Sequence, residues 1–143
     1  MPRTIQYNYE YQYRPTQTRN GEWVWEPYID AVFALEEGSR SRRGIALVDS
    51  GAAWCAMPRS IAVDWFGIDA GACPLEYLEG ITGNVGVPYA TFRVKAFGLW
   101  ATCKVLLIES GLYLIGRVPF FSLVGVGFFE DEVNRSNNRI LCT

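Results

Sequence analysis

Hydrophobic and polar residues alternate over much of the chain, a period of two that is typical of β-strands. The clearest case lies near the start, where Ile5 and four tyrosines up to Tyr13 alternate with polar residues. This pattern predicts a strand with an aromatic face over residues 5–13. A loop is expected over 15–21, where Asn-Gly signals a turn. A second strand over 22–26 is then placed to pair back onto the first.

Further apolar or alternating segments predict more strands, at residues 28–35, 45–48, 75–79, 87–97, 99–108, 112–116, 125–129 and 139–143. Residues 53–57 form another apolar segment. Two short helices are expected at 60–66 and 119–124, since a proline precedes or opens each and Gly67 suits the first helix's end. No repeat and no linker rich in Pro, Gly or Ser divides the chain. The pattern therefore predicts a single β-rich unit.

The length and charge of the chain narrow its class. Its 143 residues suffice for one domain with a real core. A net charge of −2 argues against a nucleic-acid partner, which normally requires a strong basic excess. The basic residues Arg40, Arg42 and Arg43 cluster between two glycines. We interpret this segment, 38–44, as a solvated hairpin tip rather than a phosphate site.

The chain shows no sign of a membrane or secretory role. No uncharged segment approaches the roughly 20 residues that a membrane span needs, and no signal peptide is visible. No Cys-x-x-Cys motif is formed by the four cysteines, which are Cys55, Cys73, Cys103 and Cys142. We therefore expect reduced thiols in a cytoplasmic protein, with Cys55 and Cys103 packed in the core.

One residue type is missing altogether, because the chain contains no histidine. Ser-His-Asp and Cys-His hydrolysis within one chain are thereby excluded, and so are zinc sites that contain histidine. We expect no metal and no cofactor. If the protein hydrolyses its substrate with its own side chains, carboxylates are the natural candidates.

One carboxylate stands out. Four apolar residues, 45–48, lead directly into Asp49, which is followed by Ser50 and Gly51. A charge at the end of a buried strand must be paired or must change its pKa, so a sequence keeps it mainly where chemistry needs it. Alone, the Asp-Ser-Gly triplet is a weak signal, since Asp and Gly occur in many turns.

Two further segments strengthen that signal. Residues 80–86 contain three glycines, which favours a flexible hairpin tip. Downstream, Leu114-Ile115-Gly116-Arg117 ends a buried strand on a glycine, where a side chain would obstruct a close backbone approach.

Together these segments resemble the retropepsin-like aspartic proteases, that is, the retroviral protease family and its single-domain bacterial relatives. The helix entry Met57-Pro58-Arg59-Ser60 is similar to the bacterial branch. The resemblance implies an all-β fold, a single-domain closed β-barrel or sandwich with a flap hairpin and one or two short helices, assembled as a homodimer. It covers residues 28–143 and leaves 1–27 as an N-terminal β extension.

The resemblance also implies roles. One chain carries one Asp-Ser-Gly, so a second copy must supply the second acid of a pair that shares one proton. Asp49 would be the catalytic acid and base, Ser50 would bond across the dimer axis, and Gly51 would bond the substrate. The flap and floor residues would hold an extended peptide or protein substrate between them: Ala52, Ile81, Thr82, Gly83, Asn84 and Val85. Ile115, Gly116 and Arg117 would be structural.

One departure and two alternatives remain. In retroviral members the arginine after the apolar-apolar-Gly motif pairs with an aspartate shortly after the catalytic triplet. Here that stretch reads Ala52-Ala53-Trp54, so Arg117 lacks the partner. The protein can also be a non-catalytic dimerisation or peptide-binding module with the same fold. A third reading is an antiparallel β domain in which Asp49 is an ordinary turn residue.

Overall fold

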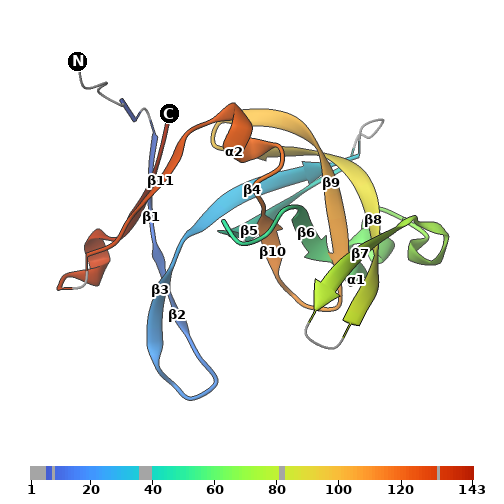
Figure 1. The fold of residues 1–143 in the computed structure, drawn as a ribbon, viewed down its shortest axis with the longest axis horizontal. Coiled ribbons are helices and arrows are strands. Elements are labelled where there is room, and N and C mark those ends of the chain that lie inside the picture. The colour runs from blue at the N-terminus through green and yellow to red at the C-terminus, as the bar shows by residue number, and fades with distance from the viewer. Residues whose placement is uncertain (1–5, 8, 36–39, 81–82, 132) are drawn as a thin grey trace.

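The computed structural model describes residues 6–7, 9–35, 40–80, 83–131 and 133–143. Within these ranges none of the helices is both long and apolar enough to cross a membrane. The described residues form twelve strands, two short α-helices and two 3₁₀ helices (Figure 1). The strands are β1 (Tyr9–Gln12), β2 (Arg14–Gln17), β3 (Trp23–Glu26), β4 (Tyr28–Ala34), β5 (Ser41–Val48), β6 (Cys55–Pro58), β7 (Leu75–Gly80), β8 (Gly83–Ala96), β9 (Leu99–Ile108), β10 (Tyr113–Ile115), β11 (Val126–Phe129) and β12 (Arg139–Cys142). The helices are α1 (Arg59–Asp64), α2 (Phe120–Leu123), η1 (Ala70–Ala72) and η2 (Arg135–Asn137).

Six strands close into a barrel, which confirms the predicted all-β class. Their order is β4-β5-β10-β6-β9-β8, and β8 pairs back onto β4 so that the sheet has no open edge there. The other half of β8 pairs with β7 instead, so that the β7–β8 hairpin extends beyond the barrel (Figure 1). Because strands in a closed barrel alternate inward and outward side chains, one face of each strand fills the interior.

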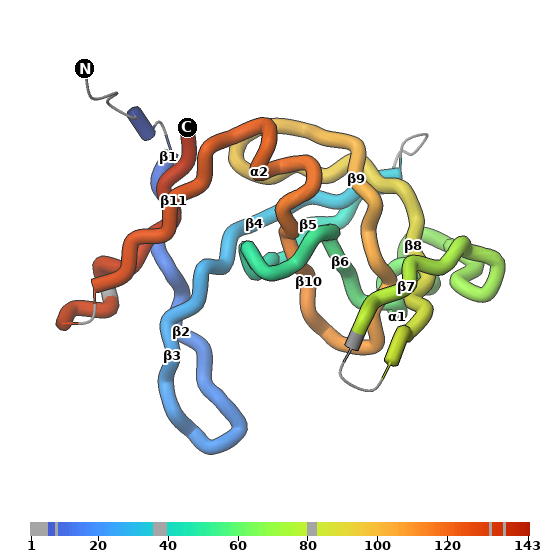
Figure 2. Tube along the Cα trace, viewed as in Figure 1, coloured from blue at the N-terminus to red at the C-terminus, as the bar shows by residue number. Residues whose placement is uncertain are grey.

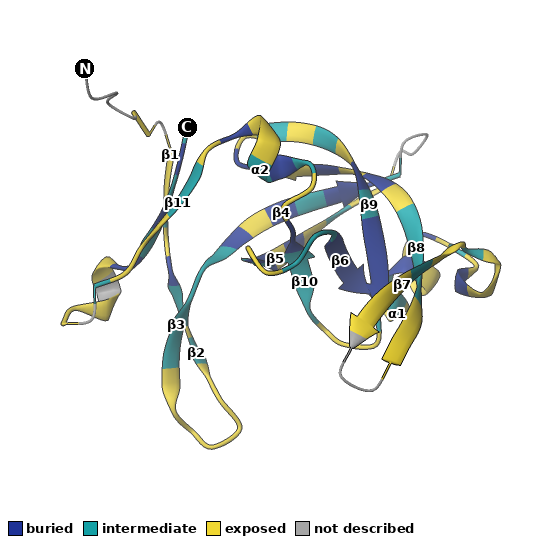
Figure 3. Ribbon diagram, in the orientation of Figure 1, coloured by how far each residue is buried: buried dark blue, intermediate teal, exposed yellow. Residues whose placement is uncertain are grey.

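Buried residues concentrate in the barrel strands (Figure 3), and the core that they form mixes aliphatic and aromatic side chains. Phe33, Phe92 and Phe120 are fully buried, and the rings of Phe66 and Phe92 meet edge to face with centroids 5.1 Å apart. The expectation of core positions for Cys55 and Cys103 is confirmed, since both are buried. All four cysteines are free thiols.

Strand β10 sets the topology around the acidic turn. It lies between β5 and β6, parallel to the first and antiparallel to the second. Ile115 pairs with Val48, and Leu114 pairs with Ala56. The downstream apolar-apolar-Gly segment is thus inserted between the two strands that flank Asp49.

The N-terminal region departs from the predicted single strand over 5–13. That prediction is wrong, because the strand ends at Gln12: β1 pairs with β12, whereas β2 and β3 form a separate hairpin, here called the arm (Figure 2). The break falls at Tyr13, whose side chain is buried and whose amide donates to the Asn138 carbonyl at 2.8 Å. Residues 15–17, expected in a loop, belong to the arm.

The arginine-rich segment is also different from the prediction. Strand β5 begins at Ser41, so Arg42 and Arg43 are strand residues paired with β4 and not part of a hairpin tip. The backbone pairing with β4 continues to Ser41 and so brings these residues into the strand. The Arg40 and Arg42 guanidinium groups contact the Trp65 ring, at 5.6 and 5.3 Å from its centroid. Arg42 is half-buried there, whereas Arg40 and Arg43 are exposed, as expected. Residues 36–39 lie outside the described ranges.

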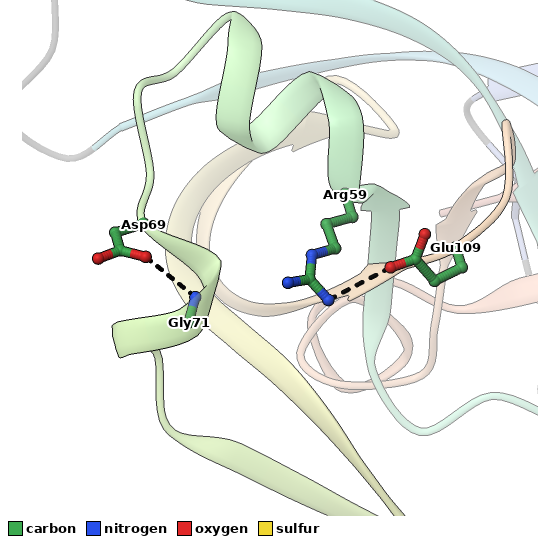
Figure 4. A network of polar contacts seen from close by, with 4 residues as sticks. All are labelled: Arg59, Asp69, Gly71 and Glu109. Carbon is green, nitrogen blue, oxygen red and sulfur yellow. Dashed lines mark hydrogen bonds and ion pairs between the residues drawn. The ribbon is translucent and has the colours of Figure 1, made fainter.

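Helix α1 is shorter than the predicted 60–66 and is attached to the barrel by an ion pair (Figure 4). Arg59, at its start, contacts Glu109 in the turn after β9 at 3.2 Å. Farther along, the Asp69 carboxylate accepts a hydrogen bond from the Gly71 amide at 3.1 Å and so caps η1. Both contacts stabilise the connection between β6 and β7.

Candidate active site

Asp49 follows directly after β5 and opens the loop of residues 49–54, here called the Asp49 loop. Its amide donates to the Ile115 carbonyl on β10 at 3.0 Å. Its carboxylate oxygen Oδ1 accepts from the Gly51 amide at 2.9 Å, and its carbonyl accepts from the Ala52 amide at 3.2 Å. The side chain is half-buried. The chain's own backbone therefore fixes this carboxylate, and Oδ2 accepts no hydrogen bond from the described residues.

The far side of the Asp49 loop rests on the segment after β10. The amides of Arg117 and Val118 donate to the carbonyls of Ala52 and Ala53, each at 2.9 Å. Between β10 and Arg117 lies Gly116, where an added Cβ would be 2.9 Å from the Trp54 amide nitrogen and nearer still to its carbonyl group. Only a residue without a Cβ allows this approach. Ile115 is fully buried beside it.

A cleft of about 580 Å³, here called the Asp49 cleft, opens beside the loop. Its lining comes from the loop, from the end of the arm and from β11. Both Ser50 and Gly51 are exposed. The residues that line the cleft are Tyr13, Glu26, Pro27, Leu47, Val48, Asp49, Ser50, Phe128 and Glu130.

The Asp49 cleft is acidic, since Glu26, Asp49 and Glu130 all line it. The Tyr13 hydroxyl donates to Glu130 at 3.3 Å. Burial, and after it the charges of Glu130 and Glu26, raise the pKa of Tyr13 to about 12. Neither glutamate was singled out from the sequence, because nothing in the spacing shows that the arm returns to Asp49.

The β7–β8 hairpin supplies the predicted flap residues. Gly80 pairs with Gly83, and Ile81 and Thr82 lie outside the described residues. Gly83 has a φ of +116°, which favours glycine, while Asn84 and Val85 are exposed. The predicted strand start at residue 87 is wrong, because residues 83–86 pair with β7 and extend β8. Several large apolar side chains of the hairpin face solvent: Leu75, Tyr77, Leu78 and Val85.

A half-buried cation joins this hairpin to the Asp49 loop. The Lys104 ammonium group lies 2.8 Å from the Glu76 carboxylate on β7 and over the rings of Trp54 and Tyr89, at 4.3 and 4.5 Å from their centroids. Both charged side chains are largely covered, with 27% of each exposed. Sequence reasoning missed this cluster. Its only signal was one lysine within the apolar strand segment 99–108.

The sequence left the role of Arg117 in doubt, because no aspartate follows the Asp-Ser-Gly triplet to pair with it. Its side chain is exposed and makes no ion pair or hydrogen bond with any described residue. The stretch Ala52-Ala53-Trp54 offers no carboxylate with which the arginine could pair. As for metals, no group of three or more His, Cys, Asp or Glu side chains is placed to hold an ion anywhere in the part of the chain that the structure describes.

Comparisons with known proteins address the fold. No protein-family model and no curated protein sequence matches the chain. Among solved structures, a retropepsin-like aspartic protease from Rickettsia conorii is 18% identical, with a TM-score of 0.55 over 99% of this chain and 97% of that one. The EIAV protease in complex with the inhibitor HBY-793 is 15% identical, with a TM-score of 0.51 over 68% of this chain and 88% of that one. The predicted resemblance is confirmed at the level of architecture: this chain has the retropepsin fold.

Proposed function

We propose that the protein is an aspartic endopeptidase whose active site forms when two copies bring their Asp49 side chains together. The observation that carries this proposal is the position of Asp49 in a retropepsin fold: its carboxylate accepts from the Gly51 amide, and its own amide donates to β10. Its chemistry is incomplete in one chain, since a lone carboxylate cannot act as acid and base at once.

The mechanism follows from pairing two equal acids. Two carboxylates a few ångströms apart cannot both ionise cheaply, so they share one proton and titrate as a pair. The ionised Asp49 takes a proton from water, which attacks the peptide carbonyl, while the protonated Asp49 donates to the carbonyl oxygen. The Asp49 that took the proton then donates it to the amide nitrogen, and the other takes a hydroxyl proton back as the C–N bond breaks and the amine leaves.

The substrate is an extended peptide that lies between the Asp49 loop and the β7–β8 hairpin. Exposed apolar side chains on the hairpin suit contact with a peptide, and main-chain groups of Gly51 and of residues 81–85 would bond its backbone. In this proposal Ala52 forms part of the floor. Ser50 bonds across the dimer axis and holds the two loops together.

The test is cleavage of a mixed peptide library by the wild type and by Asp49→Asn. We expect a bell-shaped pH profile on the acid side, inhibition by statine-type compounds, and a loss of at least about 10²-fold in the variant. Asp64→Asn is the matched control, because Asp64 is exposed on α1 and does not line the Asp49 cleft. Undiminished cleavage by Asp49→Asn would refute the proposal.

One observation favours a second candidate, a dimeric peptide-binding module without catalysis. Tyr13 and Glu26, from the N-terminal segment, line the cleft beside Asp49 and narrow the approach to it. This candidate predicts that the wild type binds peptides from the same library and returns them uncut at every pH. Turnover that depends on Asp49 excludes it.

The remaining proposals concern organisation and location. We propose that residues 28–143 form the protease domain and that 1–27 are an N-terminal β extension attached through the β1–β12 pairing. We also propose a cytoplasmic location, which suits four free cysteines.

A further inference from the structure

Two opposite charges near Asp49 have no partner in the described part of the chain. Arg117 is exposed, and Glu26 lines the Asp49 cleft, yet neither side chain forms an ion pair or a hydrogen bond with a described residue. Arg14, directly across from Glu26 on the arm, contacts Asp30 instead at 3.4 Å. A half-buried carboxylate that forms no ion pair is unfavourable, particularly next to the acid of a catalytic pair.

The backbone beside Glu26 and that of Arg117 are hydrogen-bonded on opposite sides of Ser50. The Pro27 carbonyl, next to Glu26, accepts from the Val48 amide at 2.9 Å. The Arg117 amide donates to the Ala52 carbonyl at 2.9 Å. One charge therefore sits beside residue 48 and the other beside residue 52, on either side of Ser50.

Two-fold symmetry relates these two ends. In the proposed dimer the loops face each other with Ser50 nearest the axis. In such an interface, if residue i of one copy contacts residue j of the other, then j also contacts i. Loops that meet in this way run antiparallel, so Val48 of one copy lies nearest Ala52 of the other. The same rotation brings Glu26 of one copy to Arg117 of the other.

We propose that Arg117 of each copy enters the Asp49 cleft of the other copy and pairs with its Glu26, twice in each dimer. This inference rests on the proposed dimeric function and names the contact that selects the partner. A guanidinium group is suited to the cleft, because it presents a fork of donors to carboxylates and stays charged at any relevant pH. Glu130, also in the cleft, already accepts from Tyr13, which leaves Glu26 as the carboxylate without a bond.

Charge reversal tests the contact between chains directly. The proteins are Arg117→Glu, Glu26→Arg, the double variant, and an equimolar mixture of the two single variants. The dimer dissociation constant is measured by sedimentation at neutral pH and low salt. We expect each single variant to raise it about tenfold, because every dimer then holds two like-charge contacts. The double variant and the mixture should both return to within about threefold of the wild type.

The mixture is the decisive sample. A heterodimer of the two single variants holds one original pair and one reversed pair, so an interchain contact is restored. If the double variant recovers but the mixture does not, the pair lies within one chain and the proposal is overturned. Unchanged dissociation constants in a dimeric wild type overturn it too, while the dimer of the proposed function stands. A wild type that stays monomeric at every concentration overturns both.

Controls and a milder set keep the test interpretable. Lys95→Glu and Asp64→Arg reverse exposed charges that do not line the Asp49 cleft, and should leave the constant unchanged. If Glu26→Arg fails to fold beside Arg14, the cycle of Arg117→Gln, Glu26→Gln and their double variant replaces it. If the effects of the two substitutions on the free energy of dimerisation are not additive, the two residues interact. Strictly additive effects contradict the proposed pair.

Discussion

Replacing Gly116 by alanine tests the geometry on which the candidate site depends. The new Cβ would lie 2.9 Å from the Trp54 amide nitrogen and nearer to its carbonyl carbon and oxygen. These are backbone atoms, so a change of side-chain rotamer cannot relieve the overlap. Either β10 or the Asp49 loop must move.

The cost can be estimated from what that movement breaks. Overpacking a close-fitting site costs about 1–3 kcal/mol. The two neighbouring bonds, from the Arg117 and Val118 amides to the Ala52 and Ala53 carbonyls, contribute about 1 kcal/mol each if they are lost. A total of about 3–5 kcal/mol, if both bonds are lost, is a large share of the roughly 5–15 kcal/mol of a typical domain.

Urea denaturation of the wild type and the variant measures this difference. Gly111→Ala is the control, since a Cβ at Gly111 meets nothing within 4 Å and its φ lies outside the left-handed region. We expect that control to change the free energy of unfolding by less than about 0.5 kcal/mol. A Gly116→Ala protein as stable as the wild type would refute the close approach and with it the described position of the Asp49 loop.

Two further predictions concern charged groups. Replacing Lys104 by methionine leaves Glu76 without its cation and removes both ring contacts, so amide exchange in β7 should quicken by an amount equivalent to about 1 kcal/mol. Lys95→Met is its control, and equal exchange in both variants would contradict the role of Lys104. Tyr13 should ionise near pH 12 in absorbance titrations, and Glu130→Gln should lower that pKa. Because the folded state holds this proton more tightly, the stability from Tyr13 is complete below about pH 10 and is lost as the pH rises through about 12. A Tyr13 pKa unchanged in Glu130→Gln would contradict the part assigned to Glu130.

The barrel was predictable because its strands carry local signals. Strand β9 matches its predicted range of 99–108, and β4 comes within one residue of its predicted end. Apolar runs that end in Asp49 and Gly116 also indicated where chemistry could lie. In each case the pattern of the strand and its turn contains the information, and no distant segment is needed to interpret it.

The predictions that were wrong concern elements that depend on contacts between residues distant in the sequence. Nothing in the sequence near Tyr13 indicates that its side chain is buried against a C-terminal segment. The break between β1 and β2 could therefore not be predicted. Strand β5 extends through Arg42 because it pairs there with Phe33 of β4, and the Arg42 guanidinium group packs on Trp65, more than twenty residues later. The cluster around Lys104 likewise draws on four separate segments. Tertiary contacts of this kind override local propensity.

The division between local and distant information also explains how the Asp49 loop can be ordered within a single copy. Every hydrogen bond that fixes Asp49 comes from its own loop or from β10 of the same chain, so the carboxylate is positioned before any partner arrives. Dimerisation would then require little further ordering of this carboxylate. In both of our proposals a second copy supplies charge: an acid for the catalytic pair and an arginine for the cleft beside it. On that basis we expect specificity between copies to depend on electrostatic fit on either side of Ser50.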